Sequence, residues 1–353
     1  MYLFCISNHG FGHLMRNLIV IKEFLELNKK IIIISGKKQL KFLRIYLSST
    51  QLNVNNCVFI EMNNDFGLRV RKDFLKLDYD KISNGVESHL KQFPDLIELG
   101  KKIIEKYHVT HIISDVTPWV LTSTKEMNIK STLLASFTWL DIYEEFLPEK
   151  LLELFIKSYN DAQQVIFYEL ANPQTLKRFS SGVNVGLASR NMSVDRINEI
   201  KSEFDNTKKT IFVSVGMSNN GVYSSYDVEE LPYNFITTHG VGVKGKNVKQ
   251  LPIDVLDTQN YVAASDFCIS KAGWTSISEM LLSKRPMALI RRDDNAEDRY
   301  LINKLCRRKQ AIAIDLFELS DIGKIITKMQ KVEWGSYDYQ NDSDKIANLI
   351  INY

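Results

Sequence analysis

Short apolar and β-branched runs alternate with amphipathic segments along the 353 residues of the chain. Continuous apolar runs bounded by polar stretches are typical of buried strands in parallel sheets. In the first half the expected strands are residues 2–6, 31–35, 57–61, 111–115 and 132–136; in the second half they are 210–215, 235–238, 267–270, 286–290 and 311–314. Strands that alternate with helices form βαβ units, so the pattern predicts an α/β protein with a doubly wound sheet in each half.

The two halves meet where Gly186-Leu187-Ala188 leads into a polar, charged stretch. We predict an N-terminal domain over residues 1–187, a linker over 188–208 and a C-terminal domain over 209–335. A C-terminal helix over 336–353 could pack back on the N-terminal domain. Two such Rossmann-like domains are expected to face each other across a cleft, because open α/β sheets bind ligands at the carboxyl ends of their strands.

The composition does not favour a nucleic-acid-binding, membrane-spanning or disulfide-rich protein. The 45 basic and 42 acidic residues nearly balance, so nothing in the charge demands a nucleic-acid partner. No stretch approaches the ~20 apolar residues of a membrane span. Because the first residues are expected to form a strand, no signal peptide is expected. The four cysteines lie far apart, which predicts a cytoplasmic protein without disulfides or a cysteine-ligated zinc; they are Cys5, Cys57, Cys268 and Cys306.

A glycine-containing loop follows the first expected strand and reads Asn-His-Gly-Phe-Gly-His-Leu-Met-Arg over residues 8–16. Gly10 and Gly12 allow a tight turn and a close approach of the backbone to a ligand. A helix over residues 13–27 would direct its first amides at the loop, which suits an anionic or hydroxyl-bearing ligand. His13 in its first turn is a candidate base near neutral pH. The same turn also serves in many folds only to pack a helix on a strand.

A second strand-to-helix turn lies in the C-terminal half, where a buried strand stops at Lys271 and a helix starts at about Trp274. The hydroxyls of Thr275 and Ser276 would lie beside the first amides of that helix and cradle a diphosphate. Glu279, one helical turn further, could accept hydrogen bonds from both ribose hydroxyls. The alternative is a capped helix with a solvated glutamate. Residues 291–300, after the next strand, could meet sugar hydroxyls or form an acid-rich helix start.

Residues 265–303 resemble the donor-binding region of the peptidoglycan N-acetylglucosaminyltransferase and its GT-B relatives. In that family a Ser-(Arg/Lys)-x-Gly turn, a Thr/Ser-rich helix start and a glutamate bind the UDP part of the donor. An Asp-x-Gln-x-x-Asn pattern touches the donor sugar; Asp298 and Asn303 fit it, but Tyr300 replaces the glutamine, which leaves the sugar open. Gly216, with Met217, Ser218 and Asn219, resembles the family's glycine turn at the donor phosphates. The matching positions for UDP are Lys271, Gly273, Thr275, Ser276 and Glu279.

The glycine-containing loop resembles the His-Gly-Phe-Gly-His-x-x-Arg signature of bacterial glycosyltransferase-like proteins and of the N-terminal domain of plant L-arabinokinase. Residues 112–119 and 136–143 are similar to further blocks of that group. The resemblance does not extend to the kinase domain of arabinokinase, so no kinase activity is expected from these residues. By this resemblance the loop residues are assigned to the acceptor side; they are His9, Gly10, Gly12 and Arg16.

The resemblance implies a base for the acceptor hydroxyl and stabilisation of the departing nucleotide diphosphate. We interpret His13 as the base and Asp115 as the residue that orients its imidazole. Related plant glycosyltransferases use such a His–Asp pair, and the spacing from Asp115 to Trp119 matches theirs. The alternative for Asp115 is a buried helix cap before Pro118. Because the helix start and Lys271 would carry the charge of the leaving group, no cofactor and no metal are expected.

The function predicted from these motifs is an inverting, metal-independent transfer of a sugar from a nucleotide-sugar donor, UDP-linked, to an acceptor hydroxyl in the synthesis of cell-surface glycans. The acceptor would be lipid-linked or a small molecule. One alternative is a hydrolase similar to the UDP-sugar hydrolase of pseudaminic acid synthesis, in which His13 activates water. The other is a non-catalytic nucleotide-sugar-binding module.

A basic stretch in the first half bears on where the protein acts. Arg69, Arg71, Lys72 and Lys76 are interleaved with apolar residues. They would make peripheral contact with the inner face of the membrane, or form an ordinary solvated helix face.

Overall fold

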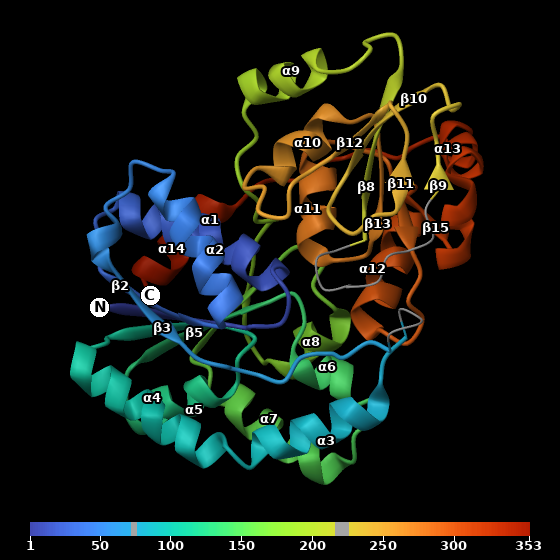
Figure 1. The fold of residues 1–353 in the computed structure, drawn as a ribbon. Helices are drawn as coiled ribbons and strands as arrows, with labels where there is room; N and C mark the ends of the chain where they lie inside the picture. Colours follow the sequence, from blue (N-terminus) through green and yellow to red (C-terminus); the bar gives the residue numbers. More distant parts are fainter. Residues whose placement is uncertain (72–75, 216–225) are drawn as a thin grey trace. The chain divides into compact units, whose positions relative to one another are not determined.

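The computed structural model describes residues 1–71, 76–215 and 226–353, and it is an α/β protein (Figure 1). Its contacts divide the chain into two compact units. Unit 1 comprises Met1–Ala188 together with Asn341–Tyr353, and unit 2 comprises Ser189–Gln340. Each unit is built on one parallel sheet.

Unit 1 contains a seven-stranded sheet in the order β3-β2-β1-β4-β5-β6-β7. Figure 1 shows α1, α2 and α14 on one face of this sheet and α4, α5 and α7 on the other. The strands are β1 (Tyr2–Ile6), β2 (Ile31–Ser35), β3 (Cys57–Glu61), β4 (His111–Asp115), β5 (Lys130–Ala135), β6 (Gln164–Phe167) and β7 (Val183–Asn184). The helices are α1 (Gly12–Glu26), α2 (Lys37–Ser48), η1 (Val54–Asn56), α3 (Tyr79–Leu90), α4 (Phe93–Tyr107), α5 (Trp119–Glu126), α6 (Trp139–Tyr143), α7 (Glu149–Asn160), α8 (Pro173–Arg178) and α14 (Ser343–Ile351).

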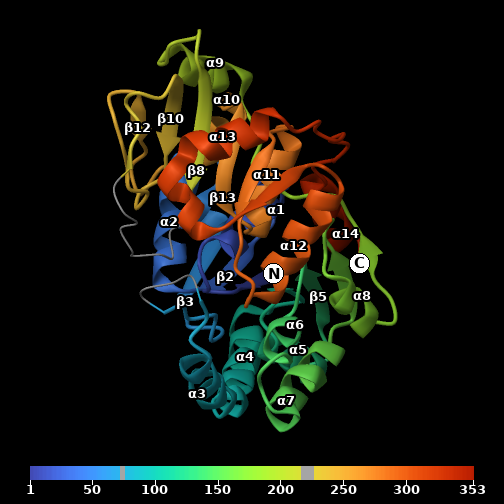
Figure 2. The ribbon, with the colours of Figure 1, turned by 90° about the vertical axis from the view of Figure 1, so that its right-hand side faces the viewer.

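Unit 2 contains a six-stranded sheet in the order β12-β10-β8-β13-β14-β15 and a small pair of strands, β11 and β9. Figure 2 shows β12, β10, β8 and β13 next to one another in this order. The strands are β8 (Lys209–Ser214), β9 (Tyr226–Asp227), β10 (Tyr233–Thr237), β11 (Val243–Lys244), β12 (Val248–Gln250), β13 (Phe267–Lys271), β14 (Met287–Ile290) and β15 (Ala311–Ile314). The helices are α9 (Val194–Ser202), α10 (Thr258–Ala264), α11 (Trp274–Leu282), α12 (Ala296–Arg307), η2 (Leu316–Asp321) and α13 (Ile322–Gln330).

The expected strands are all present, with ends that shift by at most two residues. The hydrophobic pattern identified them by their apolar runs, and the central strands are buried on both faces, as in β2, where all five residues are buried. It missed β6, β7, β9, β11 and β12. β6 is an internal strand with three buried residues, but its apolar run is short. β9 and β11 are two residues each, and β7 and β12 lie at the sheet edges with exposed or half-buried side chains. Edge strands of this kind carry no continuous apolar run, so the hydrophobic pattern does not mark them.

The segment expected to be a linker, residues 188–208, contains a helix. α9 begins at a Ser193 side-chain cap and packs on α10 within unit 2. Ile200 of α9 is fully buried, while the other faces of this helix carry the charged residues that give the segment its polar sequence. At the other end of the chain, α14 packs on α1 and buries Ile346 and Ile350.

The strand order places the loops of interest at equivalent points of the two units. In each sheet the chain order reverses beside the first strand, between β1 and β4 in unit 1 and between β8 and β13 in unit 2. Loops that leave the carboxyl ends of two such strands run to opposite faces of the sheet, and ligands of open α/β sheets bind there. The glycine-containing loop, Asp115 and Lys271 all lie at these positions. Among the helices in the described part of the chain, none has the length and apolar character needed to cross a membrane.

Candidate active site

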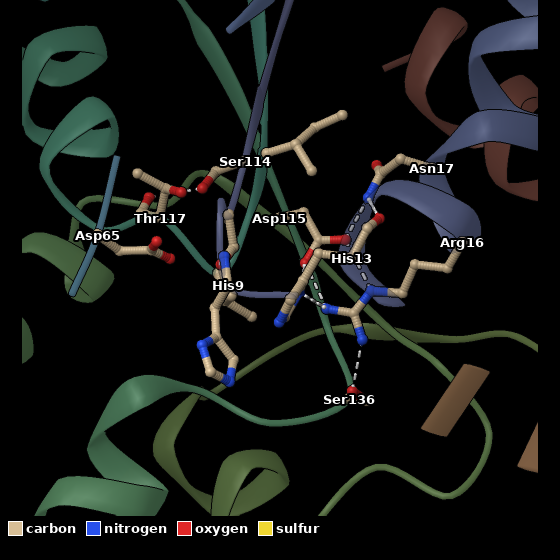
Figure 3. Close-up of polar contacts among 12 residues, drawn as sticks. His9, His13, Arg16, Asn17, Asp65, Ser114, Asp115, Thr117 and Ser136 are labelled. Carbon is tan, nitrogen blue, oxygen red and sulfur yellow. Dashed lines mark hydrogen bonds and ion pairs between the residues drawn. The ribbon is translucent and has the colours of Figure 1, made fainter. Parts of the chain in front are cut away.

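His13 and Asp115 form a buried pair at the reversal point of unit 1 (Figure 3). Asp115 is the last residue of β4 and lies opposite Ile6 at the end of β1, and the chain then turns through the glycine-containing loop into α1. His13 Nδ1 lies 2.8 Å from Asp115 Oδ1. The exposed fractions are 7% for His13 and 0% for Asp115, so the pair is shielded from solvent by the protein. The structure thus brings together the two residues predicted to be catalytic.

Arg16 and Asn17 complete the environment of the Asp115 carboxylate. Arg16 Nε donates to Oδ2 at 2.7 Å, its Nη2 donates to Oδ1, and Asn17 Nδ2 also donates to Oδ2. His13, Arg16 and Asn17 lie on one face of α1, because residues three and four apart on a helix are neighbours. Arg16 Nη1 also donates to Ser136 Oγ at 2.7 Å. The assignment of Arg16 to the acceptor side is therefore corrected: its side chain is 2% exposed and binds Asp115.

The charges around Asp115 decide its ionisation. Burial raises the pKa of the carboxyl, but the charges and hydrogen bonds of Arg16 and His13 outweigh it and lower the pKa from 3.8 to about 2. An ionised carboxylate only accepts hydrogen bonds, so His13 Nδ1 carries a proton in this contact, and in the neutral imidazole the lone pair is then on Nε2. Arg16 Nη2 lies 3.0 Å from the same Nδ1, but a guanidinium only donates, and its acceptor here is Oδ1. The arrangement presents Nε2 as a base.

We expect Asp115→Asn to make the free energy of unfolding less dependent on pH in the acid range. The lowered pKa of Asp115 means that its ionisation stabilises the fold above the ordinary pKa of 3.8, and this stabilisation is lost as pH falls towards 2. Between about pH 6 and pH 2, the difference in unfolding free energy between wild type and Asp115→Asn should shrink by about 2 kcal/mol. Urea unfolding at a series of pH values measures it. A difference that stays constant over this range would contradict the ionised, charge-paired Asp115.

The alternative interpretation of Asp115 as a helix cap is not supported. α5 begins at Trp119, and its N-cap position, Pro118, has no side-chain cap. The side-chain bonds described for Asp115 all lead to α1 instead. Val116, which lies between Asp115 and α5, adopts a φ of 55°, a left-handed conformation that is rare for a β-branched residue. The Tyr159 hydroxyl donates to the Val116 carbonyl at 2.6 Å and helps to hold this turn.

The glycine-containing loop is clamped from two sides. Gly10 has a φ of 66°, and a Cβ there would meet no atom within 4 Å, so the glycine is required by conformation rather than by crowding. Gln39 Nε2, from α2, donates to the carbonyls of Gly10 at 2.6 Å and Asn8 at 2.9 Å. Asn8 Oδ1 accepts from the Asn64 amide at 2.6 Å, which ties the loop after β1 to the loop after β3. Gly12 is the first residue of α1, which begins without a side-chain cap.

Trp139 lies against both histidines of the loop. Its ring centroid is 5.7 Å from that of His9 and 6.3 Å from that of His13. Its Nε1 donates to Asp65 Oδ2 at 3.0 Å, so the buried Asp65 joins the site, although it was not predicted. Asp141 positions Trp139 by accepting from the Thr138 amide at 2.6 Å at the start of α6. The block over residues 136–143 therefore has a positioning role next to His9 and His13.

The residues predicted to bind the donor nucleotide lie together in unit 2. Lys271 ends β13, and Gly273 is the N-cap residue of α11 and provides no side-chain cap. The Gly273 amide donates to the Lys271 carbonyl at 2.9 Å, which closes the turn. Thr275 and Ser276 are half-buried in the first turn of α11. Burial, and next the charge of Arg292, lower the pKa of Lys271 to about 8.

Glu279 is buried and ion-paired, so the interpretation of a solvated glutamate was wrong. Arg190 Nη2 donates to its Oε1 at 2.7 Å, and the exposed fractions are 5% for Glu279 and 4% for Arg190. Among the described residues, no hydrogen bond reaches the second carboxylate oxygen, Oε2. Arg190 was missed because it lies in the segment expected to be a linker; an arginine in an otherwise ordinary polar stretch gives no signal of its own.

The two residues assigned to the donor sugar have other partners. Asp298, in the first turn of α12, accepts from Arg292 Nε at 2.5 Å and from Nη2 at 2.7 Å. Because Asp298 is 0% exposed, its carboxylate does not face a sugar, and that assignment is corrected. The Tyr300 hydroxyl accepts from Lys304 Nζ at 2.9 Å. The predicted donor contacts at Gly216, Met217, Ser218 and Asn219 lie outside the described residues.

The basic stretch of the first half is not a helix face in its described residues. Val70 and Leu77 form an antiparallel bridge, and the Arg71 amide donates to the Lys76 carbonyl at 2.9 Å. Arg69 lies over the Phe66 ring at 4.4 Å, while Lys72 falls outside the described residues. Within the part of the chain that the structure describes, no group of three His, Cys, Asp or Glu residues is placed to hold a metal ion.

Two Rossmann-like units of this topology define the class: the chain has the GT-B fold of glycosyltransferases. MurG of Acinetobacter baumannii is similar over 100% of this chain and 99% of its own, with 11% identity and a TM-score of 0.57. UGT89C1 of Arabidopsis thaliana complexed with UDP-L-rhamnose is similar over 99% of this chain and 93% of its own, with 10% identity and a TM-score of 0.62. Its complex with quercetin is similar over 99% and 89%, with 12% identity and a TM-score of 0.59.

In sequence, no protein-family model matches the chain. L-arabinokinase of Arabidopsis thaliana is 22% identical over 329 residues. The similarity covers 86% of this chain but 29% of that protein, so this chain spans less than a third of the length of its relative.

Proposed function

We propose that the chain is a glycosyltransferase that moves a sugar from a UDP-linked donor to an acceptor hydroxyl, with inversion and without a metal ion. The observation that carries the proposal is the buried His13–Asp115 pair at the reversal point of unit 1. The GT-B fold supports it, and so do similar structures that are complexed with UDP-L-rhamnose and with quercetin. Under this proposal unit 1 takes the acceptor and unit 2 takes the nucleotide sugar.

The chemistry is a direct displacement at the anomeric carbon. The acceptor oxygen forms a bond to that carbon while the bond to the diphosphate oxygen breaks, and attack from the opposite side inverts the configuration. His13 Nε2 takes the proton of the acceptor hydroxyl. Asp115 stabilises the resulting imidazolium and keeps the proton of Nδ1 in place. His9, whose ring also lies against Trp139, would then contact the acceptor.

The leaving diphosphate takes up the electron pair of the broken bond. Lys271 and the first amides of α11, at Gly273–Ser276, would stabilise its charge. Glu279 would accept hydrogen bonds from the ribose through Oε2, with Arg190 holding Oε1. With these groups in place the transfer needs no metal and no cofactor.

The acceptor under this proposal is a lipid-linked or small-molecule hydroxyl compound used in glycan synthesis at the cytoplasmic face of the membrane. Arg69, Arg71 and Lys76 would contact that membrane. The proposal includes no nucleic-acid partner. Hydrolysis is the competing reaction, because the same base can activate water. Release of free sugar from UDP-sugars, unchanged by added acceptors, would favour it, and binding without turnover would favour a non-catalytic module.

We expect UDP to bind without a divalent metal, and Glu279→Gln to weaken it by about tenfold or more. A hydrogen bond to a charged group contributes about 1.5–3 kcal/mol, and every 1.4 kcal/mol is about tenfold in affinity. Calorimetry with UDP in the presence of EDTA measures both effects. Glu199→Gln is the matched control, since Glu199 is 66% exposed and pairs with Arg196 on α9. UDP affinity unchanged in Glu279→Gln would remove the ribose assignment, and no binding by wild type would remove the proposal of a UDP donor.

A further inference from the structure

A second cation lies beside Lys271 at the carboxyl edge of the unit 2 sheet. Lys271, the last residue of β13, is paired in register with Ile290, the last residue of β14, and Arg292 follows two residues later. Burial, and then the charge of Arg292, lower the pKa of Lys271, which fits the closeness of the two groups. The same edge carries the start of α11. Two cations therefore flank the helix start at which the nucleotide is proposed to bind.

Asp298 holds the Arg292 guanidinium in one orientation. The bidentate contact uses Nε and Nη2, and the Asp298 amide in turn donates to the Asn295 side chain at 3.2 Å. Arg292 is largely buried, with a side-chain exposed fraction of 12%, and Asp298 is completely buried. Within residues 1–71, 76–215 and 226–353, no hydrogen bond engages Nη1. The guanidinium is thus fixed in place and keeps one nitrogen available for a ligand.

The physical cost of this arrangement indicates the charge of the ligand. Two neighbouring cations withdrawn from water repel each other, and an anion between them offsets both the repulsion and the loss of hydration. Asp298 pairs directly with one side of Arg292, through Nε and Nη2. The charges of Glu297 and Asp294 also act on the guanidinium, without a contact to Nη1 among the described residues. A phosphate group suits the remaining side, because guanidinium and ammonium groups form strong, charge-assisted hydrogen bonds to phosphate oxygens. The amides at the start of α11 favour the same charge.

We propose that Arg292 is a phosphate-binding residue that, together with Lys271, grips the diphosphate of the nucleotide donor, and that Asp298 positions it. This inference rests on the proposed function, because it assigns a further residue to the same donor site. It also gives Asp298 a role in the site although its carboxylate is buried: the residue acts through Arg292. Arg292 would contribute to the affinity for the phosphates and not to the affinity for the nucleoside.

The adjacent arginines provide a matched test. We expect Arg292→Gln to weaken UDP binding by about tenfold or more while uridine binding stays within about twofold of wild type. Arg291→Gln should leave both within about twofold of wild type, since Arg291 is 48% exposed and lies 3.6 Å from Asp315. Calorimetric titrations with uridine, UMP and UDP in EDTA measure the ratio of affinities for each variant. The largest loss should appear with UDP and the smallest with uridine.

A folding defect must be separated from a binding defect, because Arg292→Gln leaves the buried Asp298 without its partner. The double variant Arg292→Gln/Asp298→Asn removes both charges, and circular dichroism with thermal unfolding identifies the folded variants. If a folded variant keeps the wild-type ratio of UDP to uridine affinity, the inference is overturned while the UDP donor stands. If wild type binds neither ligand, the UDP donor and the inference fail together.

Discussion

Replacing His13 with alanine is expected to reduce turnover of the nucleotide sugar by roughly 10²–10⁴-fold, the usual contribution of a general base. The dissociation constant of UDP should change by less than about twofold, because the nucleotide is proposed to bind to unit 2. Asp115 keeps its bonds to Arg16 and Asn17 in the variant, so the fold should survive the change. Steady-state turnover and calorimetry with UDP, measured on the same preparation, test the two parts.

The matched control for this variant is His108→Asn. His108 is exposed at the end of α4 and adopts a φ of 50°, a conformation that asparagine tolerates well. Turnover in this control should stay close to wild type. If His13→Ala instead loses turnover and UDP affinity in the same proportion, His13 contacts the nucleotide or supports the fold and is not the base.

Replacing Arg16 with methionine is expected to lower the free energy of unfolding by about 3–5 kcal/mol at neutral pH. Methionine keeps much of the volume of the side chain but removes the charge that pairs with the fully buried Asp115. It also removes the hydrogen bond to Ser136 and the contact of the guanidinium with the Tyr168 ring, 5.2 Å from its centroid. Urea unfolding monitored by circular dichroism measures the loss.

Two further variants isolate the cause of this loss. Arg44→Met removes a more exposed arginine that lies 4.1 Å from the Phe59 ring centroid, and it should cost less than about 1 kcal/mol. Arg16→Met/Asp115→Asn should recover part of the stability, because no carboxylate then remains buried without its cation. Equal losses in Arg16→Met and Arg44→Met would contradict the ion pair as the source of the stability.

Most of the fold could be predicted because the central strands are buried on both faces. Their apolar runs, such as Ile31–Ser35, are visible without any knowledge of neighbours. The helix over residues 194–202 was missed for the opposite reason: only one of its residues, Ile200, is buried, so its sequence is mainly polar. Strands β7, β9, β11 and β12 were missed because a strand of two or three residues buries too little. β6 was missed although three of its four residues are buried, because its apolar run is short.

Local motifs predicted the individual loops of the candidate site but not the residues that contact them. The turn at Gly10 and the start of α11 at Gly273 are formed by consecutive residues, so they can be predicted from the local sequence. The partners of those loops are distant in the chain. Nothing in the local sequence indicates that Arg190 binds Glu279, 89 residues away, or that Asp65 binds Trp139, 74 residues away.

The amino-acid sequence by itself determined the alternation of strands and helices, the two glycine turns and the identity of His13 as a candidate base. These depend on periodicity, backbone freedom and residue chemistry, which are properties of neighbouring residues. Only the tertiary structure decided which charged groups lie next to one another and form ion pairs. It turned Arg16 towards Asp115, because the parallel strands β1 and β4 come from distant parts of the chain and end at one edge of a sheet. Ionisation and hydrogen bonding depend on that proximity and on exclusion of water, which no local pattern encodes.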